Sequence, residues 1–219
     1  MPSTQSLPFL IGHVDSGFEP VRDAFLANFE QGQEVGAAVA VYRRGRPVVD
    51  LAAGLRDRAT SAPYDGETLQ PVFSATKGIV ALAANMLVDR GQLDLNAPVA
   101  AYWPEFAQAG KSQVTVRWLL THQAGVLGLD EPISHSQLLA WNYVIDRLAS
   151  QRPDCRPGSE HGYHTLTYGF LVGEVIRRVT GSSPGEYVRR EIAGPLDADL
   201  FIGLPEDLEG RVAPPCCRT

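Results

Sequence analysis

Apolar residues recur at helical spacing in two long segments of the chain. In residues 75–90 the positions of Ile79, Leu82 and Met86 are three or four residues apart, and Gly91 follows as a stop signal. Residues 166–179 repeat this spacing. The pattern therefore predicts two long amphipathic helices. Shorter helices are predicted in the same way over residues 17–31, 115–122 and 136–150.

Strand-like patterning is confined to the N-terminal part of the chain. Residues 36–42 and 47–53 are rich in valine and alanine, and an Arg-Arg-Gly-Arg turn separates them. This arrangement predicts a β-hairpin. Residues 54–68 and 151–163 hold several glycines and prolines and are predicted to be loops. The expected class is α+β, with an antiparallel sheet flanked by helices and a mostly helical subdomain at approximately residues 90–160.

Composition narrows the class of partner. The chain has 219 residues, 44% of them hydrophobic, and a formal net charge of −6. This apolar content excludes a disordered chain, and the acidic balance disfavours a protein that binds the nucleic-acid backbone. No apolar run approaches the ~20 residues of a membrane span. A small-molecule partner is expected, with no nucleic acid, no membrane span and no cofactor.

The cysteines and lysines are informative because they are few. Cys155, Cys216 and Cys217 form neither a disulfide framework nor a zinc pattern, so a cytoplasmic location is predicted. The basic residues are 17 Arg and only 2 Lys, which are Lys77 and Lys111. Because arginine supplies nearly all of the positive charges, a lysine at a given position calls for a chemical explanation. The best explanation is that lysine can lose its proton whereas arginine cannot.

Ser74 and Lys77 form the first candidate catalytic pair. They are three residues apart at the start of a predicted helix, so the amine can reach the hydroxyl. A serine is a weak nucleophile until a neighbouring base takes its proton, and a lysine among apolar residues can do so. The alternative interpretation is an N-cap serine followed by a surface lysine.

Tyr163 is the second candidate, at the end of the long loop and before a predicted helix. A phenol beside an ammonium group can relay protons, because the positive charge favours its ionised form. The alternative is a tyrosine that only packs against its neighbours.

Three other patterns have structural explanations. Residues 181–185 match the G-x-S-x-G pattern of a hydrolase nucleophile, but Ser183 also fits a helix-capping box with Glu186. His161 and His164, with Cys155 or the two C-terminal cysteines, have no common zinc spacing, so no metal site is predicted. His122 is expected to make local hydrogen bonds rather than to catalyse.

Four segments, taken in order, resemble the serine β-lactamase-like superfamily and, within it, the class C-like esterase branch. They are FSATKG, GQLDLNAPVAAYWPEF, VRWLLTHQAG and GYHTLTYGFLVGEVIRRVTG, and the resemblance covers roughly residues 15–212. It implies that Ser74 is the acylated nucleophile, that Lys77 is its activating base, and that Tyr163 relays the proton to the leaving group. The implied substrate is a small ester or lactam.

The chain departs from the family pattern at two places. Thr165 stands where the family has Asn or Ser, so its hydroxyl is the candidate substrate contact. The Lys-Thr-Gly or similar third motif, which in the family supplies a second oxyanion N–H and pairs beside the hairpin, does not appear. The expectation is one β-lactamase-like domain over residues 1–219, incomplete at its C-terminus. Three functions stay open: an active serine hydrolase, with an esterase favoured; a truncated relative that binds acyl compounds or is acylated once, without turnover; and a non-enzymatic interaction protein that keeps the helical half as a surface. An exposed sheet edge would favour association in the last two cases.

Overall fold

The computed structural model describes residues 9–32 and 34–215, which divide into two compact units. Unit 1 comprises the chain up to Pro71 together with the segment from Leu204 onward, and unit 2 is the continuous stretch Val72–Gly203. Cys155 carries a free thiol. Cys216 and Cys217 lie outside the described residues.

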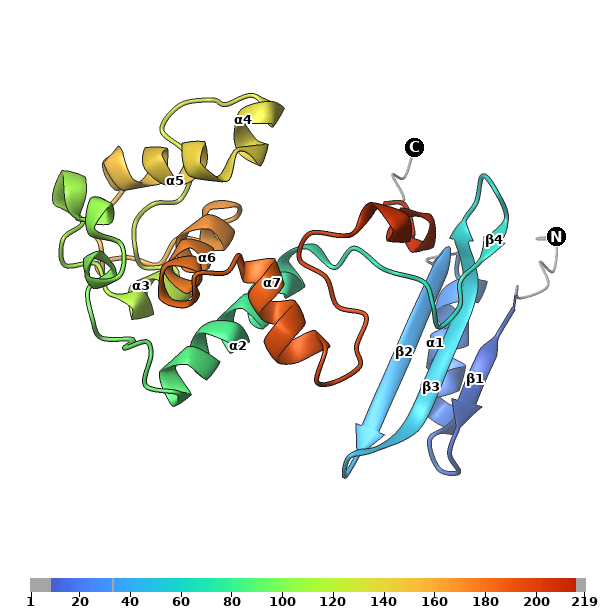
Figure 1. Cartoon of the computed structure of the whole chain (residues 1–219). Helices are drawn as coiled ribbons and strands as arrows, with labels where there is room; N and C mark the ends of the chain where they lie inside the picture. The colour runs from blue at the N-terminus through green and yellow to red at the C-terminus, as the bar shows by residue number, and fades with distance from the viewer. Residues whose placement is uncertain (1–8, 33, 216–219) are drawn as a thin grey trace. The chain divides into compact units, whose positions relative to one another are not determined.

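Unit 1 is built on an antiparallel sheet (Figure 1). The central strand β3 (Arg46–Asp57) pairs with β1 (Ile11–Val14) and with β2 (Gly36–Arg43), and β4 (Ala62–Pro63) pairs with the end of β3. The predicted hairpin is therefore confirmed as β2 and β3. The prediction of only two strands is wrong, since β1 and β4 are too short and too exposed to show a pattern.

The two faces of β3 have different partners. Helix α1 (Glu19–Glu30) runs along one face, where its Phe25 joins alternate residues of β3 in one cluster (Figure 1). These residues are Val49, Leu51 and Ala53. On the other face, Ala52 packs with Tyr64 and Ala213. The two-residue period explains how one strand serves both clusters.

The outer edge of β2 has no partner strand among the described residues, because β2 pairs with β3 alone. A groove of about 930 Å³ runs along it, lined by the start of β2, by Tyr64 and by Ala213–Pro215. Residues 213–215 follow the short turn η5 (Glu206–Arg211). A parallel bridge between Leu69 and Val212 holds this last segment within unit 1.

Unit 2 is helical, and its core is one cluster of buried residues drawn from most of its helices. The two long predicted helices are confirmed as α2 (Thr76–Asp89) and α6 (Thr167–Thr180). The remaining elements are α3 (Val116–Leu120), α4 (His135–Leu139), α5 (Trp141–Ser150), α7 (Pro184–Val188), and the short turns η1 (Phe73–Ala75), η2 (Val99–Ala101), η3 (Pro104–Gly110) and η4 (Arg189–Ala193).

The single helix predicted over residues 136–150 is wrong, because the structure has two helices there. Ser134 caps α4 with a capping box, and the chain becomes extended at Ala140 before α5 begins. The break lets the Trp141 ring pack against Phe170 and its indole N–H reach Glu174, both on α6. Tertiary contacts therefore interrupt a helical pattern that is continuous in the sequence.

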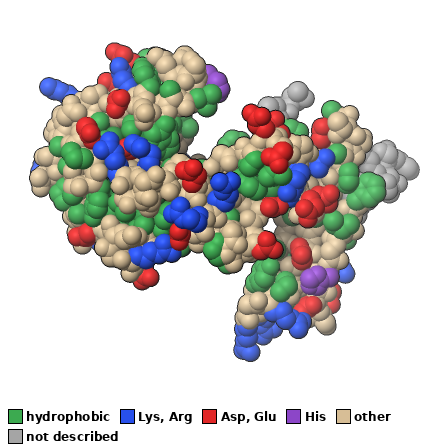
Figure 2. Space-filling view, viewed as in Figure 1, with side chains coloured by type: hydrophobic (Ala, Val, Ile, Leu, Met, Phe, Trp, Pro, Cys, Tyr) green, Lys and Arg blue, Asp and Glu red, His purple; other side chains and the backbone are tan. Residues whose placement is uncertain are grey.

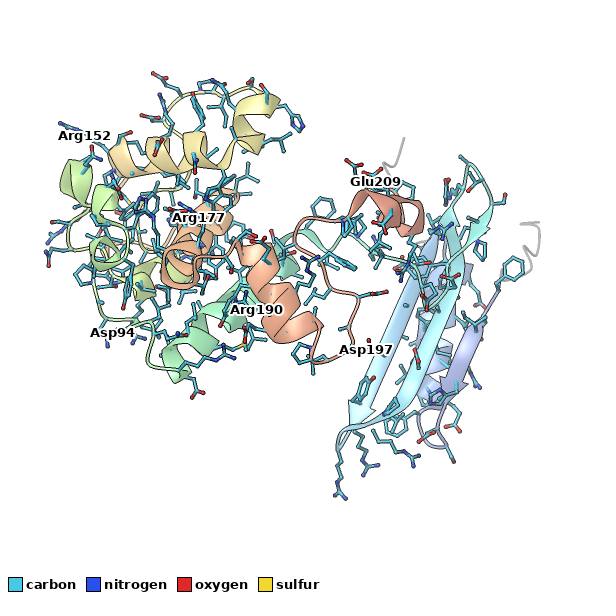
Figure 3. The ribbon with its side chains drawn as sticks, viewed as in Figure 1. Asp94, Arg152, Arg177, Arg190, Asp197 and Glu209 are labelled. Carbon is cyan, nitrogen blue, oxygen red and sulfur yellow. The ribbon has the colours of Figure 1, made fainter. Side chains whose placement is uncertain are left out.

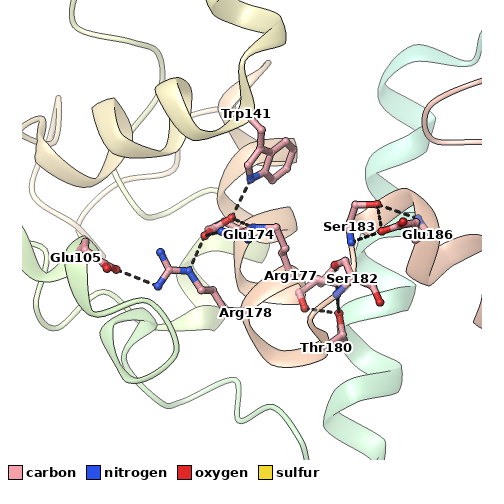
Figure 4. A network of polar contacts seen from close by, with 10 residues as sticks. Glu105, Trp141, Glu174, Arg177, Arg178, Thr180, Ser182, Ser183 and Glu186 are labelled. Atoms are coloured by element: carbon pink, nitrogen blue, oxygen red, sulfur yellow. Dashed lines mark hydrogen bonds and ion pairs between the residues drawn. The ribbon is translucent and has the colours of Figure 1, made fainter.

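Glu174 is a fully buried carboxylate at the centre of a polar network (Figure 4). It accepts hydrogen bonds from Trp141 at 2.9 Å, from Arg177 at 2.7 Å and from Arg178 at 2.6 Å. Burial opposes its charge, but these hydrogen bonds outweigh burial and lower the pKa of Glu174. Arg177 projects from α6 within unit 2 (Figure 3). The network ties α5 to α6.

Acidic and basic side chains are interspersed over the face that Figure 2 shows, except at the tip of the β2–β3 hairpin, where basic side chains gather. Arg43, Arg44 and Arg46 lie at that tip. Among the described residues, none of the helices combines the length and the apolar character that a bilayer crossing requires.

Candidate active site

Ser74 lies at a sharp turn of the backbone in unit 2. It is the middle residue of η1, which leads directly into α2. The preceding residue, Phe73, has a φ of +44°, a left-handed conformation that is strained for a bulky side chain. Ser74 is exposed. The strained turn therefore presents the hydroxyl at the start of a rigid helix.

Lys77 lies one turn after Ser74 and contacts it directly. Its Nζ donates to Ser74 Oγ at 3.1 Å and to the backbone carbonyl of Thr165 at 2.8 Å. The same Nζ lies 4.8 Å from the centre of the Tyr163 ring and 5.9 Å from that of Tyr168. Within the described part of the chain, no carboxylate forms an ion pair with Lys77. The contacts of Lys77 Nζ are therefore with a hydroxyl, a backbone carbonyl and two aromatic rings.

Tyr163 belongs to the loop before α6 and is half exposed. Hydrogen bonding to Ser74 and to Lys77, with the Lys77 charge as a further contribution, lowers the pKa of the Tyr163 phenol. The structure thus brings together the three side chains that the sequence analysis selected. They come from η1, from α2 and from a loop about ninety residues later.

Thr165 contacts this group through its backbone rather than through its side chain. Its carbonyl accepts from Lys77, while its side chain is exposed to solvent. The role of its hydroxyl in binding substrate stays a prediction. The carbonyl contact could not have been predicted from the residue type, because every residue carries a carbonyl.

His122 supports the loop that carries Tyr163. Its backbone carbonyl accepts from Gly162 N–H at 3.0 Å, and its ring Nδ1 accepts from His164 N–H at 3.1 Å. The prediction that the hydrogen bonds of His122 are local is therefore wrong for these two, which reach across forty residues to either side of Tyr163. The signal for this role in the sequence was the Leu-Thr-His turn within one of the quoted segments.

The other candidate patterns have separate roles. Ser183 caps α7: its Oγ accepts from Glu186 N–H at 3.2 Å, and its own N–H donates to the Glu186 carboxylate at 2.8 Å (Figure 4). The capping interpretation of the G-x-S-x-G match is therefore confirmed. His164 is buried with both ring nitrogens in hydrogen bonds, to Gly162 O and from Val126 N–H. Among the described residues, no group of three metal-ligating side chains is placed to hold an ion.

The chain resembles known proteins over nearly its whole length. A family model described as Beta-lactamase matches residues 21–214. "Esterase/beta-lactamase LipL" of Mycobacterium tuberculosis is 41% identical over 206 residues, which are 93% of this chain and 48% of that protein. The chain therefore spans about half the length of this curated relative.

Two solved structures share the fold. A family VIII carboxylesterase is 44% identical with a TM-score of 0.90, and the match covers 94% of this chain and 57% of the other. A penicillin-binding protein homolog from Caulobacter crescentus is 42% identical with a TM-score of 0.90, over 94% of this chain and 55% of the other. The α+β class predicted from the sequence is confirmed.

Proposed function

The chain belongs to the beta-lactamase family, and on that premise we propose that it is a serine hydrolase that cleaves small esters or lactams through an acyl-enzyme on Ser74. The contact that carries the proposal is the 3.1 Å hydrogen bond between Lys77 Nζ and Ser74 Oγ. A nucleophile in direct contact with a possible base is the arrangement that covalent catalysis requires.

The acylation step uses the three side chains in turn. Lys77, after releasing its own ammonium proton to solvent, takes the proton of Ser74 while Ser74 Oγ bonds to the substrate carbonyl carbon. The carbonyl oxygen becomes an oxyanion, and the Ser74 backbone N–H, in the first turn of η1, donates to it. When the oxyanion collapses, the bond to the leaving alkoxide breaks, and Tyr163 gives that alkoxide its phenolic proton. Lys77 then returns a proton to Tyr163.

The deacylation step reverses these proton transfers. Water bonds to the acyl carbon as its proton passes to neutral Lys77, either directly or through Tyr163, which gives its own proton to Lys77 as it accepts that of water. The bond to Ser74 Oγ then breaks, and Lys77 returns the proton to Oγ. The hydroxyl of Thr165 is the proposed contact for the substrate in both steps. An ester is favoured over a lactam, because Thr165 carries no amide at the position where the family has Asn or Ser, and relatives of this chain are named esterases.

The test is intact-mass spectrometry of the full chain after incubation with p-nitrophenyl acetate, with release of p-nitrophenol followed in parallel. Ser74→Ala is expected to lose at least about 10³-fold of the acylation rate. Ser183→Ala is the matched control, because it removes a serine of a nucleophile-like pattern that only caps α7. Release beyond one equivalent that depends on Ser74 supports a hydrolase with turnover. Absence of labelling at Ser74 in folded protein contradicts the proposal.

A second candidate function follows from the outer edge of β2, which has no partner strand among the described residues. In this alternative the chain is acylated once without turnover and associates with another chain through that edge. One stable acyl adduct per chain, together with dimers in analytical ultracentrifugation, would support this alternative over the hydrolase with turnover.

Two broader expectations accompany the proposal. We propose that units 1 and 2 are parts of one β-lactamase-like domain, because the family model spans residues of both. The cytoplasmic location stays a prediction that rests on the cysteine pattern.

A further inference from the structure

His122 has an unusual backbone conformation for a residue with a side chain. It follows α3 with a φ of +60°, in the left-handed region that residues with a side chain seldom adopt. Glycine would adopt this conformation without strain. A histidine in such a turn directs attention to what its side chain contacts.

The contacts of His122 show what that side chain does. Its carbonyl holds Gly162 N–H, and its Nδ1 holds His164 N–H, so one residue fixes the backbone on both sides of Tyr163. The His122 ring also lies 4.9 Å from the Tyr163 ring, centre to centre. Gly162 also packs closely against Leu127, because a Cβ at this position would come within 2.5 Å of Leu127 Cδ2.

The ring can hold His164 N–H only while Nδ1 is without a proton. Protonation there would place one N–H against another and break the contact. Burial, followed by the neighbouring His164, His161 and Lys77, lowers the pKa of His122. Tyr163 and Tyr168 are the other titratable groups that face the ring, at 4.9 and 5.1 Å between ring centres. The neutral form with its proton on Nε2 is therefore the one that these surroundings favour.

We propose that His122 is a positioning residue that holds the Tyr163 phenol against Ser74 and Lys77 by accepting His164 N–H at Nδ1. The inference rests on the proposed role of Tyr163 in the reaction. His122 itself touches none of the reacting atoms in this scheme. It acts through the loop backbone, so its loss moves the phenol without removing it.

Two substitutions separate the acceptor from the strained backbone. His122→Asn places Oδ1 where Nδ1 stands, and asparagine tolerates the left-handed conformation. His122→Gly accepts the backbone conformation and removes the acceptor. His161→Ala is the matched control, because the exposed His161 ring meets the His122 ring at 5.7 Å without being its hydrogen-bond partner on the loop.

The experiment measures two quantities in the full chain. The first is the rate of Ser74 acylation by p-nitrophenyl acetate. The second is the titration of the Tyr163 phenol near 295 nm, obtained as the difference from the same variant carrying Tyr163→Phe. His122→Gly is expected to slow acylation by about 10- to 100-fold, since a small misplacement of a catalytic group has effects of this size. It should also raise the pKa of Tyr163 toward the ordinary tyrosine value.

His122→Asn is expected to keep both quantities, with an acylation rate within about 3-fold of wild type and an unmoved Tyr163 titration. Equal values for wild type, His122→Gly and His122→Asn overturn the proposal. Equal losses in both variants, with circular dichroism showing folded protein, also overturn it, because the acceptor would then not be the cause. If wild type itself fails to acylate, the hydrolase proposal fails, while the Tyr163 titration still decides the role of His122.

Discussion

Lys77 and Lys111, the two lysines of the chain, hold their ammonium groups in similar ways in two regions of unit 2. Each donates to a backbone carbonyl, of Thr165 for Lys77 and of Gln151 for Lys111. Each also lies over an aromatic ring, at 4.8 Å from the Tyr163 ring and at 5.3 Å from the Phe106 ring. The direct contacts of the two amines do not by themselves distinguish a candidate catalytic amine from a structural one.

The surroundings distinguish them. Lys77 has the hydroxyl of Ser74 within reach and lies beside exposed residues. Lys111 is fully buried, and burial lowers its pKa to about 8. Lys111 therefore has the shifted pKa that is often taken as a sign of catalysis, but the hydrogen-bond partner of its Nζ among the described residues is the Gln151 carbonyl, which is not a nucleophile. Geometry has to come before pKa in choosing between two such groups.

The largest effect is expected from a substitution that prevents residue 77 from releasing and accepting a proton. Lys77→Arg keeps the positive charge and the donors, but an arginine stays protonated. The rate of acylation with p-nitrophenyl acetate is expected to fall by about 10³-fold, while the free energy of unfolding in urea changes by less than about 0.5 kcal/mol. Retention of the wild-type rate would show that Lys77 is not the base.

A smaller effect is expected at Glu174, a buried charge that, unlike Lys111, forms ion pairs. Glu174→Gln is expected to lower the free energy of unfolding by about 2 kcal/mol at pH 7, a value reduced from that of fully buried pairs because Arg177 and Arg178 are partly exposed. The pKa of Glu174 is lowered on folding. Its carboxylate therefore stabilises the folded state above the unfolded-state pKa of about 4.3, and this stabilisation is lost as the pH falls through the folded-state pKa.

Urea unfolding between pH 3 and 7 measures this loss. Glu105→Gln is the control, because its carboxylate contacts Arg178 at the surface, and it should cost less than about 0.5 kcal/mol. An equal effect of the two substitutions would mean that burial does not set the importance of Glu174.

The smallest expected effect is a change in how steeply the free energy of unfolding depends on pH. The folded protein releases the Lys111 proton near pH 8, whereas the unfolded chain keeps it to about 10.4, so wild-type stability should rise with pH in between. Lys111→Met lacks this contribution, and its slope should be lower by at most about 1.4 kcal/mol per pH unit. Unfolding in urea from pH 7.5 to 9.5 measures the difference.

Measurements that stop at pH 9.5 avoid a contribution from the ionisation of two buried tyrosines. Burial raises the pKa of Tyr64 and of Tyr168, so their ionisation would lower stability only above about pH 10. Parallel slopes for wild type and Lys111→Met would contradict the assigned pKa of Lys111.

The sequence predicted those helices and strands whose own residues carry a clear hydrophobic spacing or turn signal. Helices α2 and α6 follow from apolar residues at i, i+3 and i+4, and the β2–β3 hairpin follows from its turn. Strand β1 was missed because it has four mostly exposed residues and depends on pairing with β3. The break at Ala140 was missed because contacts of Trp141 with α6 impose it.

The candidate site divides in the same way. The spacing of Ser74 and Lys77 predicted their contact, since it is local to one turn. Tyr163 was chosen for the proton-relay chemistry of a phenol and then by the family resemblance, because no local pattern links it to residues so far away in the chain. The Thr165 contact uses a backbone carbonyl, which every residue has, and both hydrogen bonds of His122 to the Tyr163 loop end on backbone N–H groups about forty residues away. The residue types alone therefore do not predict these contacts.

The bridge between Leu69 and Val212 has a topological consequence. The two segments of unit 1 that flank unit 2 are hydrogen-bonded to each other, with Leu69 N–H donating to Arg211 O at 2.9 Å and Ala213 N–H to Leu69 O at 2.9 Å. In the language of domain insertion, unit 1 is a host whose chain leaves and returns at adjacent points, and unit 2 is its guest. All the side chains of the candidate site belong to the guest, so the chemistry is encoded in one uninterrupted stretch of chain.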